Sequence, residues 1–261
     1  MVNNEFDEEI KYKLFRTVNE ILHPTISKKN ISDYKIIMDD DILPVRVFYP
    51  KKITGIDKIV IYVHGNGEVT NCLGEYSNIC KNFAVKTNCL VIAIEYDDIK
   101  GSYNEIVNEV KKCINYLYDK LIINNIKEED IILMSDSTGS HITSLIKDIS
   151  IKKRIMFYPV LKAVYTKKNM KNEDFNIGLI ERINKHFKDL KVLDDVVVDD
   201  KEFDKMLVLI GSVDMLIDDI KNSLVSDKIT CVDISFSSHG FLKDMDKELS
   251  NEVFTVVNKF I

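Results

Sequence analysis

Short apolar runs recur along this chain, and from the third run onward stretches of helical period separate most of them. Continuous apolarity within a run is typical of a strand that is buried on both faces of a sheet. Strands that alternate with helices form parallel sheets through right-handed crossovers. The sequence therefore predicts an α/β fold with a mostly parallel central sheet and helices on both faces. The runs with strand character are Lys35–Met38, Val45–Tyr49, Lys58–Val63, Leu90–Glu95, Ile131–Met134, Arg154–Tyr158, Met206–Ile210 and Ile229–Ile234.

Two local patterns refine this architecture. The first two runs are separated only by MDDDILP, which predicts an antiparallel hairpin at one edge of the sheet. Residues Tyr103–Leu121 predict an amphipathic helix. Its apolar stripe consists of Ile106, Val110, Cys113, Ile114 and Leu117.

Residues 1–32 and 162–200 do not fit the alternation of strands and helices. The first segment has apolar residues in helical step ahead of any strand, and the second is a polar insertion with an amphipathic helix at about Ile177–Leu190. Such helices usually pack on the core, but either segment could instead cover a site at the carboxyl edge of the sheet. We predict a single domain over residues 1–261, with 1–32 as an N-terminal cap helix region and 162–200 as a small helical cap insertion.

Charge and hydropathy exclude several classes of protein. The net charge is −6 and the sequence pI is near 5.5, whereas nucleic-acid binding calls for clustered Lys and Arg. The longest unbroken apolar stretch, Cys89–Ile94, is far shorter than the roughly 20 residues of a membrane-spanning helix. Acidic residues near the start stand where a signal peptide would carry positive charge. The sequence therefore predicts a cytoplasmic protein that neither binds nucleic acid nor spans a membrane.

The five cysteines fit a reducing compartment. Their number is odd, no two of them form a C-x-x-C pair, and several stand in apolar runs. We therefore predict reduced core thiols. The residues concerned are Cys72, Cys80, Cys89, Cys113 and Cys231.

A polar cluster directly follows the strand Ile131–Met134. Small residues two before and two after a serine, between a strand and a helix, are typical of a nucleophile elbow, the strained turn that exposes a reactive serine. Here Ser137 stands between Ser135 and Gly139, and Ser140–Ile151 can carry the helix. Taken alone, this cluster is more often an ordinary polar turn. Ser137 becomes a candidate nucleophile only if the chain supplies a base.

Histidine is the base whose proton affinity best suits activation of a serine near neutral pH. His239 follows the last strand in a short polar loop, at the same sheet edge as the predicted elbow. His141 is one turn into the helix after Ser137 and is expected to point along that helix. His23 and His186 lie in the two segments outside the alternation and are expected to be structural or exposed. His239 is therefore the candidate base.

A carboxylate should then orient the imidazole. Asp214 follows the strand Met206–Ile210 in the loop Gly211-Ser212-Val213-Asp214. Asp218 and Asp219 would open the next helix, where acidic side chains interact favourably with the helix dipole. Asp214 is the candidate orienting residue.

Acyl transfer also needs donors for a developing oxyanion. The strand Lys58–Val63 ends in His64-Gly65-Asn66-Gly67, a glycine-rich loop that can turn its backbone N–H groups toward a ligand. The chain thus carries an oxyanion-type loop, an elbow serine, an acid and a histidine in succession, each after a different strand. The succession of serine, acid and histidine is the order found in α/β hydrolases.

These motifs resemble those of the hormone-sensitive-lipase-like carboxylesterases of the α/β-hydrolase fold. The family's H-G-G-G loop corresponds to His64-Gly65-Asn66-Gly67, and its G-D-S-A-G-G elbow to Ser135-Asp136-Ser137-Thr138-Gly139-Ser140. Its G-x-x-D-x-L-x-D-E segment matches residues 211–219, and its H-G-F matches residues 239–241. The similarity runs in register over about residues 35–261.

The resemblance implies a serine esterase that cleaves short-chain acyl esters through Ser137, His239 and Asp214 and forms an acyl-enzyme intermediate, without a cofactor. The oxyanion donors would be the backbone N–H groups of Asn66, Gly67 and Thr138. The segments 1–32 and 162–200 would form a cap over the acyl and alcohol pockets.

The sequence departs from the family at several positions. Asn66 replaces a glycine, and Ser135 and Ser140 replace glycines at the elbow, where we expect backbone strain. The family's Y-R-L-A-P-E is here residues 96–101, of which only Tyr96 is retained.

Other functions remain open at this stage. The chain could be a non-catalytic small-molecule binding protein on a hydrolase scaffold, or a peptidase, amidase or transacylase with the same three residues. The acidic runs 39–41 and 194–195 could suggest a metal enzyme, but they lack the spacing of a calcium loop and are interpreted as solvated turns. The expected partner is a small-molecule ester, and a homodimer is left open.

Overall fold

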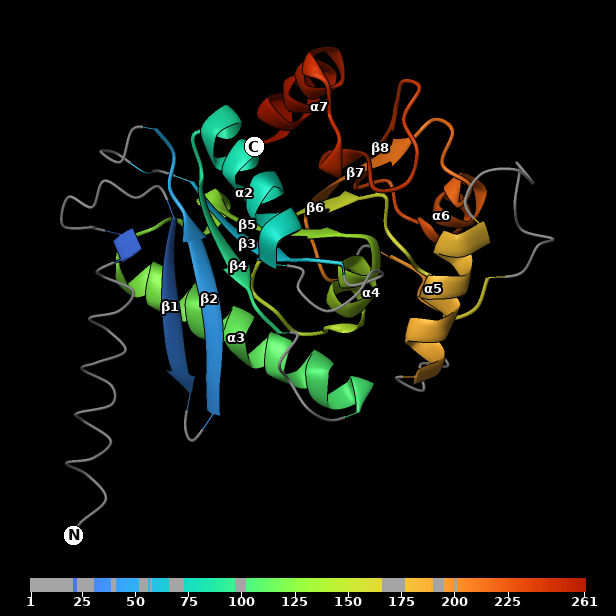
Figure 1. Cartoon of the computed structure of the whole chain (residues 1–261). Helices are drawn as coiled ribbons and strands as arrows, with labels where there is room; N and C mark the ends of the chain where they lie inside the picture. Colours follow the sequence, from blue (N-terminus) through green and yellow to red (C-terminus); the bar gives the residue numbers. More distant parts are fainter. Residues whose placement is uncertain are drawn as a thin grey trace, which may run out of the picture.

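The computed structural model describes residues 21–22, 31–38, 41–51, 56, 58–65, 73–96, 102–165, 177–189, 195–199 and 201–261. These residues form an eight-stranded sheet with helices on both of its faces (Figure 1). The strands are β1 (Ile31–Met38), β2 (Asp41–Phe48), β3 (Ile59–Val63), β4 (Leu90–Ile94), β5 (Ile131–Asp136), β6 (Lys153–Phe157), β7 (Lys205–Gly211) and β8 (Ile229–Ile234).

The sheet is mostly parallel. Its strand order is β1-β2-β4-β3-β5-β6-β7-β8; β2 pairs antiparallel with β1 and β4, and all other neighbours are parallel. The chain passes from β3 outward to β4 and then returns to β5 on the other side of β3. The strand order therefore reverses at the carboxyl ends of β3 and β5, the place where open α/β sheets bind ligands.

Two apolar cores flank the sheet. Helices α2 (Leu73–Thr87) and α7 (Lys247–Phe260) pack on one face, where they bury residues such as Phe83 and Phe254. Helices α3 (Tyr103–Ile123), α5 (Ile177–Asp189) and α6 (Ile217–Ser223) pack on the other face. Successive residues of β3 enter opposite cores, as the two-residue period of a strand requires. The short helix α4 (Ser137–Leu145) directly follows β5.

The predicted α/β architecture is confirmed. All eight predicted runs are strands, the first two form the antiparallel pair at one edge, and the helices predicted from Tyr103 and from Ile177 begin at those residues. The helix after the elbow was predicted too late. It begins at Ser137 rather than Ser140, because the chain turns from β5 into the helix at the single left-handed residue Ser137 (φ 44°), and it ends at Leu145.

The prediction of burial on both faces is correct for β3 to β7 and wrong for β8. Strand β8 is the last strand of the sheet and is largely exposed. As a consequence Cys231 is exposed, whereas Cys80, Cys89 and Cys113 are buried free thiols as predicted. Cys72 lies outside the described residues.

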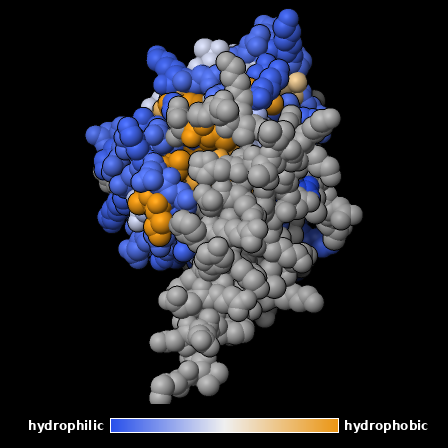
Figure 2. Space-filling view, turned by 90° about the vertical axis from the view of Figure 1, so that its left-hand side faces the viewer, coloured by the Kyte–Doolittle hydropathy of each residue, from blue (hydrophilic) through white to orange (hydrophobic). Residues whose placement is uncertain are grey.

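The segments predicted to form a cap are described only in part. Of residues 1–30, only Ile21 and Leu22 are described, and both are buried in the core with α3. Residues 166–176, 190–194 and 200 of the predicted insertion lie outside the described residues. On the face beside β1, the described surface is mostly hydrophilic, with apolar atoms gathered in separate small areas (Figure 2). No helix among the described residues is long and apolar enough to span a membrane.

Candidate active site

The turn between β5 and α4 presents a single serine to solvent. Ser137 has a left-handed backbone (φ 44°) and is partly exposed, whereas Asp136 and Thr138 beside it are only 2% exposed. A serine in this conformation is strained. This strained turn therefore places the Ser137 hydroxyl at the surface, directly after the buried strand β5.

The structure brings Ser137, His239 and Asp214 into one chain of contacts. Ser137 Oγ lies 3.0 Å from His239 Nε2, and His239 Nδ1 lies 3.0 Å from Asp214 Oδ2. The Asp214 side chain is fully buried, and that of His239 is 6% exposed. With Nδ1–H donating to the carboxylate, the Nε2 lone pair faces the serine hydroxyl, which is the arrangement that proton removal requires.

The loops that carry Asp214 and His239 are tied to each other. The backbone N–H of Val213 donates to Ser237 O (3.0 Å), and that of Leu216 donates to Asp214 Oδ1 (2.9 Å). Gly211 packs so closely that an added Cβ would lie 2.3 Å from Ser237 O. These contacts fix the acid relative to the histidine. Asp218 and Asp219 occupy the first turn of α6, as predicted.

Backbone strain is concentrated around these residues. Of the non-glycine residues with positive φ in the described part of the chain, three are Asn or Asp, which tolerate this conformation. The others are Ser137, Tyr158 (φ 34°) and Phe236 (φ 49°), which follow β5, β6 and β8. The Tyr158 ring lies 5.0 Å from the His239 ring. Each such residue costs about 1–3 kcal/mol, and strain of this kind is frequent at functional sites.

An anion beside Ser137 would meet the N-terminus of α4. The N–H groups in the first turn of a helix have no intrahelical partner and carry a partial positive charge. The predicted donor Thr138 is in this first turn. The other predicted donors, Asn66 and Gly67, lie outside the described residues.

Two glycines allow the loop after β3 to pack against the elbow. A Cβ added at Gly139 would lie 2.3 Å from His64 O, and one added at Gly65 would lie 2.7 Å from the Ser137 Cβ. These distances are too short for any side chain. The start of the predicted oxyanion loop is therefore in direct contact with the turn that carries the serine.

Asp136 joins the same two segments. Its Oδ1 accepts the Gly65 N–H (2.7 Å) and the Tyr62 hydroxyl (2.6 Å). Burial raises the pKa of the Asp136 carboxyl, and these two hydrogen bonds oppose that shift. Burial, together with the charge of Asp136, raises the pKa of the Tyr158 hydroxyl well above its usual range.

The strain expected at Ser135 and Ser140 is not found. Neither residue has a positive φ. Their buried hydroxyl groups lie 3.1 Å apart, and Thr143 Oγ1 donates to Ser135 Oγ at 3.1 Å. The buried hydroxyl groups of the two serines that replace family glycines are therefore hydrogen-bonded to each other.

The other histidines do not approach Ser137 Oγ within the described structure. His141 is fully buried, with Nδ1 2.7 Å from the Tyr103 hydroxyl and its ring 4.8 Å from that of Phe187. His23 and the side chain of His186 lie outside the described residues.

Comparison with protein families matches residues 60–224 to the family described as alpha/beta hydrolase fold. This match covers more than half of the chain. The chain belongs to the alpha/beta hydrolase fold family. The resemblance to its hormone-sensitive-lipase-like branch is thereby confirmed.

Solved structures of similar shape include esterases. The chain is similar to the hyperthermophilic esterase of the archaeon Pyrobaculum calidifontis, with a TM-score of 0.69 and 15% identity over 99% of this chain and 90% of that chain. It is similar to a thermostable esterase from Pseudomonas putida, with a TM-score of 0.71 and 12% identity over 95% and 88% of the two chains. The Francisella virulence factor BioJ gives a TM-score of 0.65 and 20% identity over 95% and 90%. At these identities the likeness establishes the fold. No curated protein matches the chain by sequence.

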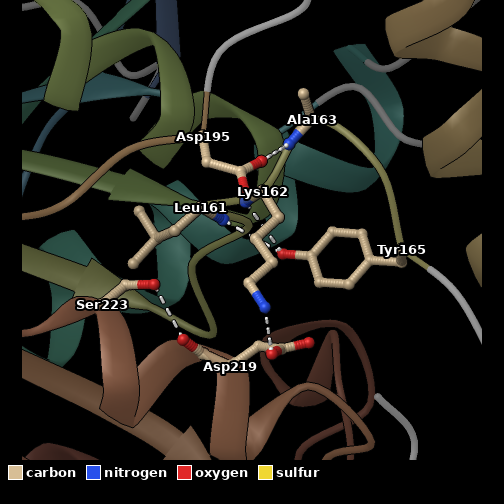
Figure 3. Close-up of polar contacts among 7 residues, drawn as sticks. All are labelled: Leu161, Lys162, Ala163, Tyr165, Asp195, Asp219 and Ser223. Carbon is tan, nitrogen blue, oxygen red and sulfur yellow. Dashed lines mark hydrogen bonds and ion pairs between the residues drawn. The ribbon is translucent and has the colours of Figure 1, made fainter. Parts of the chain in front are cut away.

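In this hydrolase a polar cluster, missed by the sequence analysis, connects the segment after β6 to α6 (Figure 3). Lys162 Nζ forms an ion pair with Asp219 Oδ1, with only 24% and 9% of the two side chains exposed. The Tyr165 hydroxyl accepts the N–H groups of Leu161 and Lys162, and Ser223 Oγ donates to Asp219 O at 2.8 Å. The sequence did not predict this ion pair, because the two charged residues are 57 positions apart and no local pattern relates them.

The Lys162 cluster also reaches the elbow. The N–H of Val160, two residues before Lys162, donates to Ser137 O at 3.0 Å. The first turn of α6, which holds Asp219, begins three residues after Asp214. The cluster thus connects the segment that contacts the serine with the helix that follows the acid.

The acidic runs 39–41 and 194–195, considered for a metal site, are described only in part. Asp39, Asp40 and Asp194 lie outside the described residues. Asp195 Oδ1 accepts the Ala163 N–H at 2.8 Å. Within the ranges that the structure describes, no group of three or more His, Cys, Asp or Glu side chains could hold a metal ion.

Proposed function

We propose that this hydrolase is a serine carboxylesterase that cleaves short-chain acyl esters. The observation that carries the proposal is the chain of two 3.0 Å contacts from Ser137 through His239 to Asp214, with the serine in a strained, partly exposed turn. The family supports hydrolysis, and the resemblance to hormone-sensitive-lipase-like carboxylesterases supports a small ester as substrate.

The first half of the reaction acylates the enzyme. Ser137 Oγ attacks the ester carbonyl carbon while His239 Nε2 accepts the hydroxyl proton. Asp214 accepts a hydrogen bond from Nδ1–H and stabilises the resulting imidazolium. The carbonyl oxygen becomes an oxyanion near the Thr138 N–H, with Asn66 and Gly67 as the further proposed donors. The C–O bond to the alcohol then breaks, and His239 gives its proton to the leaving oxygen.

The second half releases the acid. A water molecule attacks the acyl-enzyme carbonyl while His239 Nε2 accepts a proton from it. The bond to Ser137 Oγ breaks, the serine recovers its proton from His239, and the carboxylic acid leaves. Every proton transfer uses the same imidazole nitrogen.

A panel of matched esters and amides tests the reaction class. We expect hydrolysis of p-nitrophenyl acetate and butyrate and little hydrolysis of the corresponding anilides. Ser137→Ala should lower kcat by at least about 10³-fold. Ser144→Ala is the matched control, since this buried hydroxyl on the same helix has no hydrogen-bond partner among the described residues.

Two results would contradict the proposal. Comparable turnover of esters and amides would favour an amidase or peptidase. Binding of an ester without turnover, unchanged in Ser137→Ala, would favour a binding protein on a hydrolase scaffold.

A further inference from the structure

A strained tyrosine follows β6 directly. Tyr158 has a left-handed backbone (φ 34°) and is only 1% exposed. Its N–H donates to Leu209 O of the neighbouring strand β7 at 2.7 Å. A bulky residue avoids positive φ, and strain of this kind persists only where the surrounding structure enforces it. The packing around Tyr158 therefore holds this residue in an unfavourable backbone conformation.

The Tyr158 ring contacts the loop that carries the candidate base. Its centroid lies 5.0 Å from that of His239, at an interplanar angle of 56°, and 5.0 Å from that of Phe241, at 78°. Both distances are typical of packed aromatic rings. Gly240, the residue between these two, has a left-handed backbone (φ 80°). The Tyr158 ring therefore packs against both sides of the turn at Gly240.

The same short segment contacts the nucleophile. The N–H of the buried Val160, two residues after Tyr158, donates to Ser137 O at 3.0 Å. Ser137 Oγ in turn lies 3.0 Å from His239 Nε2. The segment after β6 thus contacts the serine through its backbone and the histidine through a side chain. Residues 158–160 therefore hold the nucleophile and the base relative to each other.

Asp214 restrains the same imidazole in a different way. His239 Nδ1 lies 3.0 Å from Asp214 Oδ2. A single hydrogen bond restrains one atom of the ring but leaves the ring able to turn about that bond. A buried aromatic ring packed against the imidazole opposes this rotation, because the turning imidazole would collide with it. The carboxylate and the Tyr158 ring together therefore define the orientation of the imidazole.

We propose that Tyr158 is a positioning residue whose ring holds the His239 imidazole in the orientation that faces Ser137. This inference rests on the proposed function. The ring carries the effect, since phenylalanine at position 158 would keep both aromatic contacts. Misplacing a reacting group by about 1 Å can cost about 10²-fold in rate. Because His239 transfers protons in both halves of the reaction, its misplacement lowers the overall turnover.

Two substitutions at Tyr158 separate the ring from its hydroxyl group. Tyr158→Leu should lower kcat for p-nitrophenyl butyrate by about 10- to 100-fold, with KM changed by less than about threefold. Tyr158→Phe should stay within about threefold of the wild-type kcat. The matched control is Phe83→Leu, which removes a buried ring of the same core, one that packs on Phe254 at 5.9 Å between centroids. This control should stay within about twofold of the wild type.

The proton on His239 Nδ1 provides a readout that a loss of stability alone does not change. Its low-field NMR resonance, assigned by its absence in His239→Ala, should be present in the wild type, in Tyr158→Phe and in Phe83→Leu. In Tyr158→Leu it should be broadened or lost, because a mobile imidazole exchanges this proton with water. Titration of active sites with a fluorophosphonate expresses kcat per competent site, so that unfolded protein does not lower it.

Three results would overturn the inference. The first is a Tyr158→Leu variant that keeps kcat within twofold of the wild type. The second is an equal loss in Tyr158→Phe, which would assign the effect to the hydroxyl, and the third is an equal loss in Phe83→Leu, which would indicate general damage to the core. If Tyr158→Leu gives no competent sites, Tyr158→Met replaces it with the same expected loss. A wild-type protein without esterase activity or labelling would instead overturn the proposed function.

Discussion

Ser137 reaches solvent while Asp136 and Thr138 on either side of it are buried. Its hydroxyl contacts His239, although 102 positions separate the two residues in the sequence. The exposure follows from the left-handed backbone of Ser137. The contact follows from the parallel sheet: parallel strands end at the same edge, so residues just after β5, β7 and β8 become neighbours. The sequence order of motifs could therefore predict which residues meet.

The histidine makes the reaction dependent on pH. A protonated imidazole cannot accept the Ser137 proton, so activity should fall when the medium is made acidic. Initial rates of ester hydrolysis at saturating substrate, measured from about pH 8 down to about pH 5, test this dependence. A flat profile would argue against His239 as the base.

Asp136 should make stability depend on pH in the unusual direction for an acid. Burial raises the pKa of its carboxyl, so the unfolded chain loses this proton at a lower pH than the folded chain does. The raised pKa of Asp136 therefore adds stability to the folded state at low pH. This stabilisation is complete below the pKa of the unfolded chain, about 3.9, and is lost as the pH rises through the pKa of the folded chain.

Asp136→Asn isolates this effect. Both hydrogen bonds are accepted by one oxygen, Oδ1, which asparagine retains. In urea unfolding, the stability of the variant relative to the wild type should increase as the pH rises from about 4 to neutrality. If the stability difference between Asp136→Asn and the wild type stays constant or shrinks over that range, the pKa of the Asp136 carboxyl is not raised in the folded protein.

Gly139 is the elbow residue with the least room. A Cβ there would meet His64 O at 2.3 Å and Val63 O at 2.4 Å, and both are backbone atoms that cannot move aside. We expect Gly139→Ala to reduce the free energy of unfolding by about 3 kcal/mol or more. Gly178→Ala is the control, because its nearest contact is the end of the Arg182 side chain at 3.9 Å and it lies in α5. It should be neutral or slightly stabilising in thermal unfolding. Equal effects of the two substitutions would contradict the packing described.

At the scale of elements, the length and continuity of the apolar runs predicted the strands well. The exact helix bounds and the exposure of individual strands depend on tertiary contacts that the sequence does not reveal. The start of α4 was not predicted, because the polar, glycine-containing run after β5 is typical of a longer turn, whereas the chain turns at Ser137 alone. The exposure of β8 also could not be predicted, since its apolar run does not reveal that no further strand pairs with it in the described sheet. Likewise, nothing in the sequence pattern indicates that the hydroxyl groups of Ser135 and Ser140, five residues apart, form a hydrogen bond with each other.

The Lys162–Asp219 ion pair should stabilise the contact between the segment after β6 and α6. Removing one partner leaves a nearly buried charge unpaired, so Lys162→Met should cost about 1–3 kcal/mol of unfolding free energy. Because the lysine is partly exposed, the full cost of a buried pair is not expected. A double-mutant cycle with Asp219→Asn should give a favourable coupling of more than about 1 kcal/mol.

The pair Lys221–Asp233 provides the matched control for this cycle. It joins α6 to β8 at 2.6 Å, but 43% of each side chain is exposed. Its coupling should be within about 0–1 kcal/mol. A coupling for Lys162 and Asp219 no larger than this control would show that the cluster does not tie the two elements together.

At the scale of the whole molecule, the alternation of strands and helices was enough to predict a mostly parallel sheet between two helical layers. The reversal of strand order between β3 and β5 was not predictable, because it depends on which side of β3 the chain returns to. That reversal brings the His64–Gly65 backbone beside Ser137, and hence makes an oxyanion site possible there. Ser137 therefore lies at the edge of the sheet where the strand order reverses.

Reaction with a fluorophosphonate tests that central claim most directly, because it reports an activated serine without requiring the natural substrate. Intact mass spectrometry followed by peptide fragmentation locates the adduct. We predict one adduct per chain, on Ser137, with labelling at least about 100-fold slower in a folded His239→Ala variant. A protein shown by circular dichroism to be folded, yet unlabelled or labelled at another residue, would contradict the assignment of Ser137 as the nucleophile.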